Sequence, residues 1–243
     1  MEVEARPGPL VGENRGASGI KDARVEDRSK AANRYLMAKR LLDLAVASSA
    51  LVLLAPVFLI ISILIKLDSR GPVFHRRRVV AQNGHSPHPV DPSTVRTFDA
   101  FKFRTMTPDA DSVLTMDESL LREYLKNYKL DSDPRITRLG EFLRKTNLDE
   151  LPQFFNVLIG QMSVVGPRII TPPEMEKYGR MAGRLLTVRP GMSGLWQVLR
   201  GSDHSYNRRV AMDMVYIKRR NIWLDIVIIV KTAGVALGRR GSG

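Results

Sequence analysis

The sequence of 243 residues contains no cysteine and few aromatic residues. Without cysteine the chain has no disulfide bond, no thiolate metal site and no thiol nucleophile, which suits a reducing compartment. Aromatic residues make up only 7% of the sequence, so the stacking surfaces that bind single-stranded nucleic acid are not expected. The N-terminus is polar and the first long apolar run begins near Leu44, so no signal peptide is expected.

Acidic residues are also in the minority. Lysine and arginine total 38 against 25 aspartates and glutamates, which gives a formal net charge of +13. The first 33 residues balance six basic against six acidic side chains, so the whole excess lies in residues 34–243. This charge favours a polyanionic partner, either nucleic acid, anionic lipid or a phosphorylated substrate.

Residues 1–33 are rich in glycine, proline and charge and poor in large apolar side chains. Such a segment buries too little surface to offset the entropy cost of ordering. We therefore expect a mobile polar tail.

The longest uncharged stretch, LAVASSALVLLAPVFLIISILI, runs from Leu44 to Ile65. As one helix it would span roughly 33 Å, enough to cross a bilayer. Pro56 near its middle should break or kink that helix. Basic residues flank both ends, and positive charge marks the cytoplasmic side. The pattern favours a re-entrant hairpin, with a kinked single-pass helix or a buried core helix as alternatives.

The remaining sequence predicts an α+β, mainly helical domain. Residues 71–106 have the pattern of short strands joined by a turn-rich loop, and helical patterns follow at 112–126, 139–144, 153–158 and 173–182. The closing stretch NIWLDIVIIVKTAGVAL is apolar on most faces. It is expected either to lie in a membrane interface, with Trp223 at headgroup depth, or to be an ordinary core helix.

Two adjacent carboxylates, Asp149 and Glu150, precede Pro152. Proline is tolerated in the first turn of a helix, so a helix should begin close to Asp149, and Asn147 with Glu150 fits a capping box. A helix N-terminus lowers the pKa of a carboxylate, so both are expected to stay ionised, as a Mg²⁺ ligand or a carboxylate nucleophile must. The alternative is a pair of ordinary helix caps.

Basic residues surround this pair in the sequence. Lys102 and Arg104, two apart in FKFRTM, share one face if that segment is a strand. Arg144 lies shortly before the acids, and Arg168 follows a Gly-Pro turn. Carboxylates, a divalent ion and cationic side chains are the components that phosphoryl transfer requires. Each of these cations, taken alone, is also compatible with ordinary solvated surface charge.

These motifs closely resemble a known family. The run DPRITRLGEFLRKTNLDELPQFFNVLIGQMSVVGPR, with FKFRTM before it and RPGMSGLWQV and MDMVYIKRRNIWLDIVIIVKT after it, resembles the bacterial sugar transferases that are monotopic phosphoglycosyl transferases. The likeness extends from about Lys39 to Leu237. It implies transfer of a sugar 1-phosphate, here a hexose 1-phosphate, from a UDP-sugar to undecaprenyl phosphate, with release of UMP, in the first membrane step of exopolysaccharide, capsule or O-antigen synthesis.

The resemblance also implies roles for individual residues. Asp149 would attack the phosphate that bears the sugar and form a covalent phosphosugar intermediate in a ping-pong mechanism. Mg²⁺ would be bound beside Asp149, and Glu150 would assist. Further site residues, by match to the family's motifs, are Lys102 in catalysis and, in substrate binding, Arg104, Arg144, Gly166, Pro167, Arg168, Asp213 and Tyr216.

The implied location is the cytoplasmic membrane of a bacterium, entered from one side only. The expected organisation is a polar tail at 1–33, a re-entrant membrane hairpin at 34–70 and a cytosolic catalytic domain at 71–243 with an interfacial C-terminal helix. Membrane lipid is an expected partner, a homodimer is compatible with the family, and nucleic acid is not expected. The chain looks like the minimal catalytic form, because larger relatives carry an additional membrane domain.

Two positions depart from the family's pattern. Ala55 stands where a serine often precedes the proline, and Ile169 stands where a second proline often follows the Gly-Pro-Arg motif. Two other function classes remain open from the residues alone. One is a non-catalytic basic module that binds a membrane surface or nucleic acid, and the other is a metal-dependent phosphatase or nucleotide hydrolase.

Overall fold

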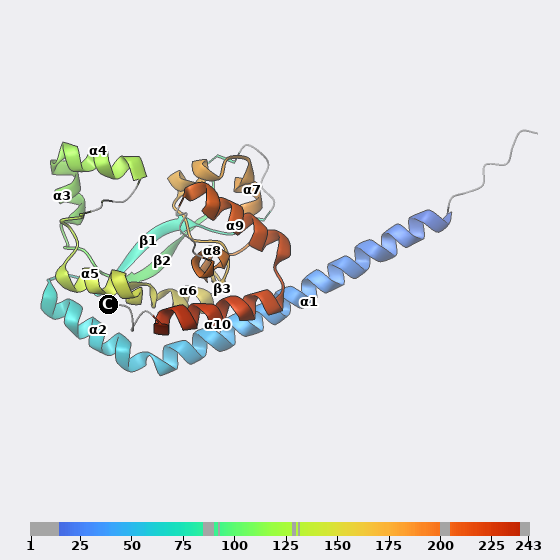
Figure 1. Ribbon diagram of the computed structural model, residues 1–243, viewed down its shortest axis with the longest axis horizontal. Helices are drawn as coiled ribbons and strands as arrows, with labels where there is room; N and C mark the ends of the chain where they lie inside the picture. Colours follow the sequence, from blue (N-terminus) through green and yellow to red (C-terminus); the bar gives the residue numbers. More distant parts are fainter. Residues whose placement is uncertain are drawn as a thin grey trace, which may run out of the picture. The chain divides into compact units, whose positions relative to one another are not determined.

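The computed structural model describes residues 15–84, 90–91, 93–127, 130, 132–199 and 205–238. It confirms a mainly helical α+β chain (Figure 1). The helices and strands, in chain order, are α1 (Arg15–Leu53), α2 (Ala55–Asp68), β1 (Phe74–Val80), β2 (Thr97–Phe103), α3 (Ala110–Met116), α4 (Glu118–Asn127), α5 (Arg138–Thr146), the 3₁₀ helix η1 (Leu148–Glu150), α6 (Gln153–Leu158), β3 (Ser163–Val165), the 3₁₀ helix η2 (Pro172–Met181), α7 (Ala182–Leu185), β4 (Gly191–Ser193), α8 (Leu195–Val198), α9 (Tyr206–Arg219) and α10 (Ile222–Gly238).

The chain divides into two units, residues 1–39 and residues 40–243. In the first unit, residues 15–39 are helical and form the beginning of α1. Part of the segment expected to be a polar tail is therefore helical, and residues 1–14 lie outside the described residues. The mobility of the tail stays a prediction.

A break separates α1 from α2 where the sequence places Pro56. Pro56 occupies the first turn of α2, the position in which its missing N–H costs least. Among the described residues no single helix is long and apolar enough to cross a membrane, but the bent pair, 59° apart, passes that test when its two helices are taken together. Such a pair is either a broken span or a re-entrant loop.

Strands β1 and β2 confirm the short strands expected within residues 71–106, and they form an antiparallel pair. In its register His75 lies opposite Lys102, and Arg77 lies opposite Ala100. Directly opposed residues in an antiparallel pair project from the same face of the sheet. Lys102, His75 and Arg77 therefore share one face.

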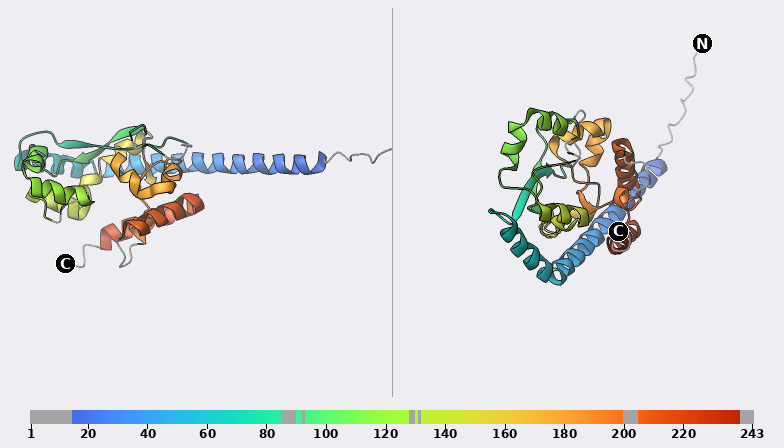
Figure 2. Two further views of the ribbon diagram at one scale, coloured as in Figure 1. Left: turned by 90° about the horizontal axis from the view of Figure 1, so that it is seen from above. Right: turned by 60° about the vertical axis from the view of Figure 1, so that its left-hand side comes forward.

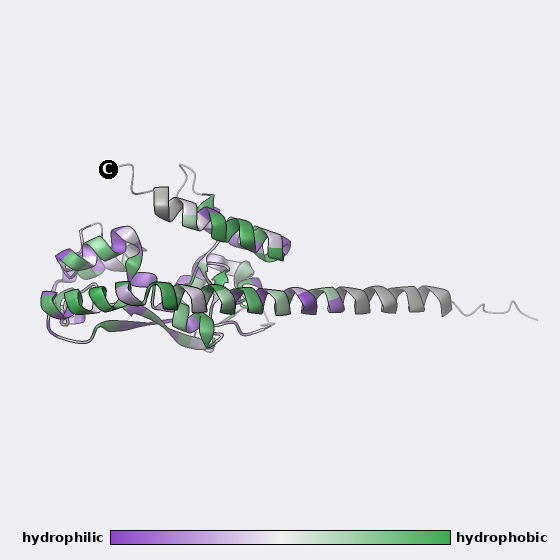
Figure 3. Ribbon diagram, turned by 90° about the horizontal axis from the view of Figure 1, so that it is seen from below, coloured by the Kyte–Doolittle hydropathy of each residue, from purple (hydrophilic) through white to green (hydrophobic). Residues whose placement is uncertain are grey.

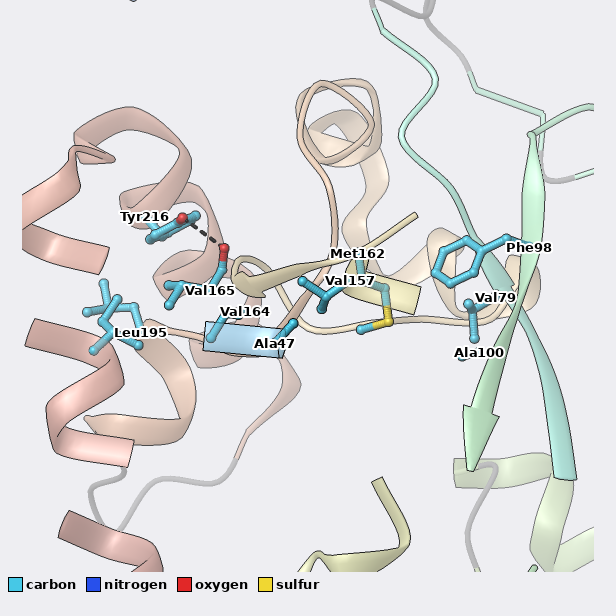
Figure 4. Close-up of a cluster of buried hydrophobic side chains, with 11 residues drawn as sticks. Ala47, Val79, Phe98, Ala100, Val157, Met162, Val164, Val165, Leu195 and Tyr216 are labelled. Carbon is cyan, nitrogen blue, oxygen red and sulfur yellow. Dashed lines mark hydrogen bonds between the residues drawn. The ribbon is translucent and has the colours of Figure 1, made fainter. Parts of the chain in front are cut away.

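The main core joins elements that are far apart in the sequence (Figure 4). Ala47 of α1, Val79 and Ala100 of the sheet, and Val157 of α6 are each fully buried in it. Figure 2 shows from two further sides that α5 and α6 lie against the bent helix pair. The elements on either side of the acid pair, α5 and α6, therefore lie between the bent helix pair and the β1–β2 sheet.

Charged side chains attach α1 to this core. Arg40 donates from its two terminal nitrogens to the carbonyl oxygens of Val157 and Leu158, each at 2.7 Å. One turn later Asp43 accepts hydrogen bonds from the Ser163 hydroxyl at 2.9 Å and the Val164 backbone N–H at 3.0 Å. The first bonds are made to C-terminal carbonyls of α6, where helical partners run out, and Val157 O also accepts from the Gly160 N–H at 3.0 Å.

Two helical predictions need correction. The helix expected over 112–126 is divided at Asp117, whose Oδ1 accepts from the backbone N–H groups of Ser119 and Leu120 and so begins a new helix. The helix expected over 173–182 is a 3₁₀ helix with a kink at Gly179, where φ is 48°. The short parallel pair β3–β4 carried no recognisable alternation and was not predicted.

Three glycines allow close backbone contact beside β3 and β4. A Cβ at Gly191 would lie 2.1 Å from the backbone nitrogen of Gly166, and one at Gly194 would lie 2.3 Å from the Gly166 oxygen. The Gly166 N–H donates to Ser193 O at 2.9 Å, and the Gly191 N–H donates to Pro167 O at 2.7 Å. These close contacts among Gly166, Gly191 and Gly194, which we call the glycine crossing, hold the Gly-Pro-Arg turn in place.

A buried carboxyl on α9 supports the same turn. Asp213 accepts hydrogen bonds from the Tyr178 hydroxyl, at 2.8 Å, and from the backbone N–H of Arg168. Burial raises the pKa of Asp213 to about 6, and these hydrogen bonds and the nearby Arg209 oppose the rise. Tyr216, also buried, donates to Asp225 Oδ1 at 2.8 Å and contacts Val165 O at 3.1 Å.

Gly191→Ala should lower the free energy of unfolding by about 1–3 kcal/mol or more, because its Cβ would overlap backbone atoms that side-chain rotation cannot move. Gly234→Ala in α10 is the control, since nothing lies within 4 Å of its Cβ and alanine favours helix. Urea unfolding followed by circular dichroism gives both values. Equal stability of the two variants would contradict the close-contact explanation.

The raised pKa of Asp213 predicts a pH-dependent stability. Its carboxyl is protonated in the folded chain at pH values where the unfolded chain has lost the proton, so its contribution to stability falls as pH rises from 3.8 to about 6. The slope is at most about 1.4 kcal/mol per pH unit. The difference in unfolding free energy between the wild type and Asp213→Asn, measured across this range, should show that fall. A constant difference would contradict the shift.

Candidate active site

The acid pair lies in η1, a single 3₁₀ turn between α5 and α6. Asn147 ends α5 in the left-handed conformation, with φ 56°, and its backbone N–H bonds back to Arg144 O. No side-chain capping bond is present at the start of η1, so the predicted capping box of Asn147 and Glu150 is wrong. The helix begins later, at Gln153, with Pro152 before it.

Lys102 of β2 binds both carboxylates. Its Nζ lies 2.6 Å from Glu150 Oε1 and 3.5 Å from Asp149 Oδ2. Asp149 is buried, and the Lys102 side chain is only 15% exposed. The structure therefore brings together the three residues that the sequence analysis named as catalytic.

The two neighbouring acids have opposite pKa shifts. Burial raises the pKa of Asp149, with Lys102 opposing the rise and the Glu150 charge adding to it. Burial also acts to raise the pKa of Glu150, but Lys102, Arg168 and Arg77 outweigh it, so this pKa lies below its ordinary value. The expectation of two lowered pKa values is thus wrong for Asp149, because that carboxyl is buried before the helix rather than capping it.

The positive charges of three arginines act on the ion-paired group of Lys102, Asp149 and Glu150. Arg144 acts on Asp149, and both Arg168 and Arg77 act on Glu150, each lowering the pKa of the carboxyl concerned. Arg144 is also oriented by its Nε, which donates to the Thr105 hydroxyl at 2.9 Å. Two of the arginines were named from the sequence, whereas Arg77 was not.

Arg104 lies elsewhere. Its guanidinium is buried at the end of α2, where it donates to the carbonyl oxygens of Arg70 and Ser69 at 2.5 and 2.7 Å. Strand β2 ends at Phe103, so the shared face expected for Lys102 and Arg104 does not continue to Arg104. Its predicted contact with substrate gains no support from this placement.

Four other predicted site residues pack around the turn that carries Arg168. Gly166 and Pro167 belong to the glycine crossing, and Asp213 binds the Arg168 backbone. Tyr216 contacts the end of β3 from α9. These four residues are all buried, so the structure places them as supports of the turn that presents Arg168.

Asn156 was not predicted to belong to the site. It is fully buried on α6, and its side chain bonds to the free edge of β2, accepting from Phe101 N at 2.9 Å and donating to Asp99 O at 2.8 Å. A second donation, to Gln161 Oε1 at 2.7 Å, fixes the amide orientation. The bonded groups lie just before Lys102, so Asn156 fixes the strand of Lys102 against the helix that follows the acids.

A metal site made of protein ligands alone is absent from the described part of the chain, where no group of three or more His, Asp or Glu side chains is arranged to hold an ion. Asp149 and Glu150 provide two carboxylates. Magnesium commonly uses one or two carboxylates together with substrate phosphate oxygens. The pair therefore fits a magnesium ion that a phosphorylated substrate helps to bind.

Comparisons with known proteins agree with this geometry. The bacterial sugar transferase family matches residues 34–239. The chain is 41% identical over 210 residues to the exopolysaccharide production protein ExoY of Rhizobium meliloti, covering 85% of this chain and 88% of that protein. It is 41% identical over 218 residues to an uncharacterized sugar transferase of Haemophilus influenzae, and 38% identical over 218 residues to the undecaprenyl-phosphate galactose phosphotransferase of Salmonella typhimurium.

Each of these last two alignments covers 88% of this chain but only 43% of the relative, so the chain spans less than half of the length of those proteins. The ExoY relative, in contrast, is matched over most of its length. The family match extends over more than four fifths of the sequence and includes the acid pair, Lys102 and the Gly-Pro-Arg turn. This chain therefore belongs to the bacterial sugar transferase family.

Proposed function

We propose that this chain transfers a hexose 1-phosphate from a UDP-sugar to undecaprenyl phosphate and releases UMP. The observation that carries the proposal is the acid pair of buried Asp149 and half-buried Glu150, both bound to Lys102. The names of its relatives support the substrates, since they include a UDP-galactose-lipid carrier transferase and a UDP-glucose:undecaprenyl-phosphate glucose-1-phosphate transferase. The names of the ExoY relatives support a role in exopolysaccharide synthesis.

The proposed reaction has two steps. An Asp149 carboxylate oxygen bonds to the phosphorus that bears the sugar, while the bond from that phosphorus to the UMP oxygen breaks and UMP leaves with the electron pair. A phosphate oxygen of undecaprenyl phosphate then attacks the same phosphorus. The bond to Asp149 breaks, the carboxylate is restored and the product is an undecaprenyl diphosphate sugar. UMP is already ionised and needs no proton as it leaves.

The surrounding residues suit these steps. Lys102, Arg144 and Arg168 supply positive charge where a diphosphate donor and a lipid phosphate must meet a carboxylate. Glu150, with its lowered pKa, stays ionised and holds Lys102 beside Asp149. Arg77 lies on the same sheet face as Lys102 and adds to this charge.

Magnesium belongs to the proposal as well. Asp149 and Glu150 would hold it with oxygens of the donor diphosphate. When bound, the ion would neutralise phosphate charge and so assist displacement at phosphorus. The residues of the chain itself keep Asp149 buried, and Lys102 and Arg144 favour its ionised form.

We also infer a membrane location, with the α1–α2 break as a re-entrant hairpin and the catalytic domain on the cytoplasmic face. Hydrophobic residues follow the second part of α1, α2 and much of α10 (Figure 3). On α2 the exposed side chains include Leu59, Ile60 and Ile63, while α10 exposes Trp223 and Val230 and buries Ile228. Exposed apolar surface of this extent is typical of a site of membrane contact.

Asp149→Asn should lower UMP release from UDP-glucose or UDP-galactose, measured with Mg²⁺ and undecaprenyl phosphate, by about 10³-fold or more, because an amide is a poor nucleophile. Asp109→Asn is the matched control, since Asp109 is exposed and makes no capping bond at α3. Without acceptor, the wild type should release at most one equivalent of UMP. Continued release without lipid would indicate a hydrolase instead, and equal activity of Asp149→Asn would contradict the proposed nucleophile.

The pH dependence should identify which charges act on Asp149. The kcat/KM for the UDP-sugar should fall on the acid side as Asp149 becomes protonated, at a pH above the ordinary carboxyl value because its pKa is raised. Lys102→Met removes a charge that lowers this pKa and should move the acid limb to higher pH. Glu150→Gln removes a charge that raises it and should move the limb to lower pH. Shifts in the same direction would refute this electrostatic arrangement.

A further inference from the structure

The guanidinium of Arg104 is enclosed by the end of a helix. Besides Arg70 O and Ser69 O, its Nη2 contacts the Ser69 hydroxyl at 3.1 Å and Ile65 O at 3.4 Å. The side chain is buried, and these acceptors are the carbonyl oxygens and the hydroxyl at the C-terminus of α2. A cation is stabilised there by carbonyl groups that lack helical partners and by the helix dipole. We call these bonds the Arg104 contact.

The turn after α2 is shaped around this side chain. Gly71 has φ 121°, and a Cβ at that position would lie 2.0 Å from Arg104 Nη1. The backbone N–H of Arg104 donates to Val73 O at 2.8 Å. The residue therefore bonds through its side chain to the end of α2 and through its backbone to the start of the next segment.

The same residue continues the strand that carries Lys102. Only Phe103 separates the two, and it packs with Ile61 and Ile65 of α2 in one buried cluster. On the other side of β2, Asn156 fixes the strand to α6. An unbroken series of contacts thus joins the end of α2 to Lys102 and, through its ion pairs, to Asp149.

We propose that Arg104 is a positioning residue that sets the distance between the catalytic group and α2, and thereby lets the site reach the phosphate of an acceptor anchored in a membrane. The inference rests on the function proposed above. An acceptor in the bilayer holds its phosphate at a fixed depth, so a site displaced relative to α2 misses it. An acceptor dissolved in water has no fixed depth and reaches the displaced site equally well.

The experiment compares two acceptors in the same reaction: undecaprenyl phosphate in lipid nanodiscs and the short, water-soluble geranyl phosphate. For Arg104→Met, kcat/KM for the nanodisc acceptor should fall by about 10²-fold, whereas the value for geranyl phosphate and the KM for the UDP-sugar should stay within about 3-fold. Gly71→Ala, which keeps the arginine but displaces Nη1, should show the same difference. Arg70→Met is the control, because it removes an exposed charge from the same turn.

Arg104→Lys keeps the positive charge but has one donor nitrogen in place of the several nitrogens of a guanidinium. Its kcat/KM should fall less than that of Arg104→Met, and only for the nanodisc acceptor. If Arg104→Met does not fold, the two acceptors are compared with Arg104→Lys instead. An equal loss with both acceptors would overturn the proposal and place Arg104 in substrate binding. Unchanged kinetics with both acceptors would overturn it as well.

Amide hydrogen exchange separates this inference from the proposed function. In nanodiscs, Arg104→Met should accelerate exchange in the last turn of α2 and in β2, with or without activity. Unchanged exchange would overturn the Arg104 contact even in an active enzyme. A wild type that releases no UMP with either acceptor would instead refute the proposed function, and the positioning role with it.

Discussion

The ion-paired group of Lys102, Asp149 and Glu150 is the interaction on which the arrangement of this protein depends. A buried carboxylate is stable only when a cation and hydrogen bonds replace water. Here the cation comes from β2 and the acids from a turn 48 residues away, since Lys102 and Glu150 are separated by that distance in sequence. The strand and the turn must therefore be held together by other contacts. Asn156 of α6 supplies them by bonding to the backbone of β2.

The nearby positive charges give the two adjacent acids different pKa shifts. Glu150 takes the shorter contact with Lys102, so it remains ionised, while Asp149 keeps the longer contact and the raised pKa. A carboxylate that is less tightly paired retains more of its basicity, and basicity contributes to nucleophilicity. The geometry of one lysine thus leaves Asp149 the less tightly paired of the two acids, which suits the nucleophile proposed above.

The sequence was sufficient to predict the residues of the ion-paired group, the broken apolar helix and the short strands within residues 71–106. Each depends on local patterns: an acid pair before proline, an uncharged run interrupted by Pro56, and turn-rich boundaries. Arg104 and Asn156 could not be assigned in this way, because their roles depend on which distant backbone groups lie beside them. The pKa of Asp149 was misjudged for the same reason, since burial is a tertiary property.

The bent helix pair has little contact with the core around its break. Between Ala47 and Ile61, both buried, none of the residues is buried, although Val52, Leu53 and Leu59 are large and apolar. Val57 and Phe58 pack in part against the cluster of Phe103. The other apolar side chains of the segment are left to whatever medium surrounds them. In plain water the only apolar medium at hand is another copy of the chain, so purification without detergent or lipid favours self-association through this segment.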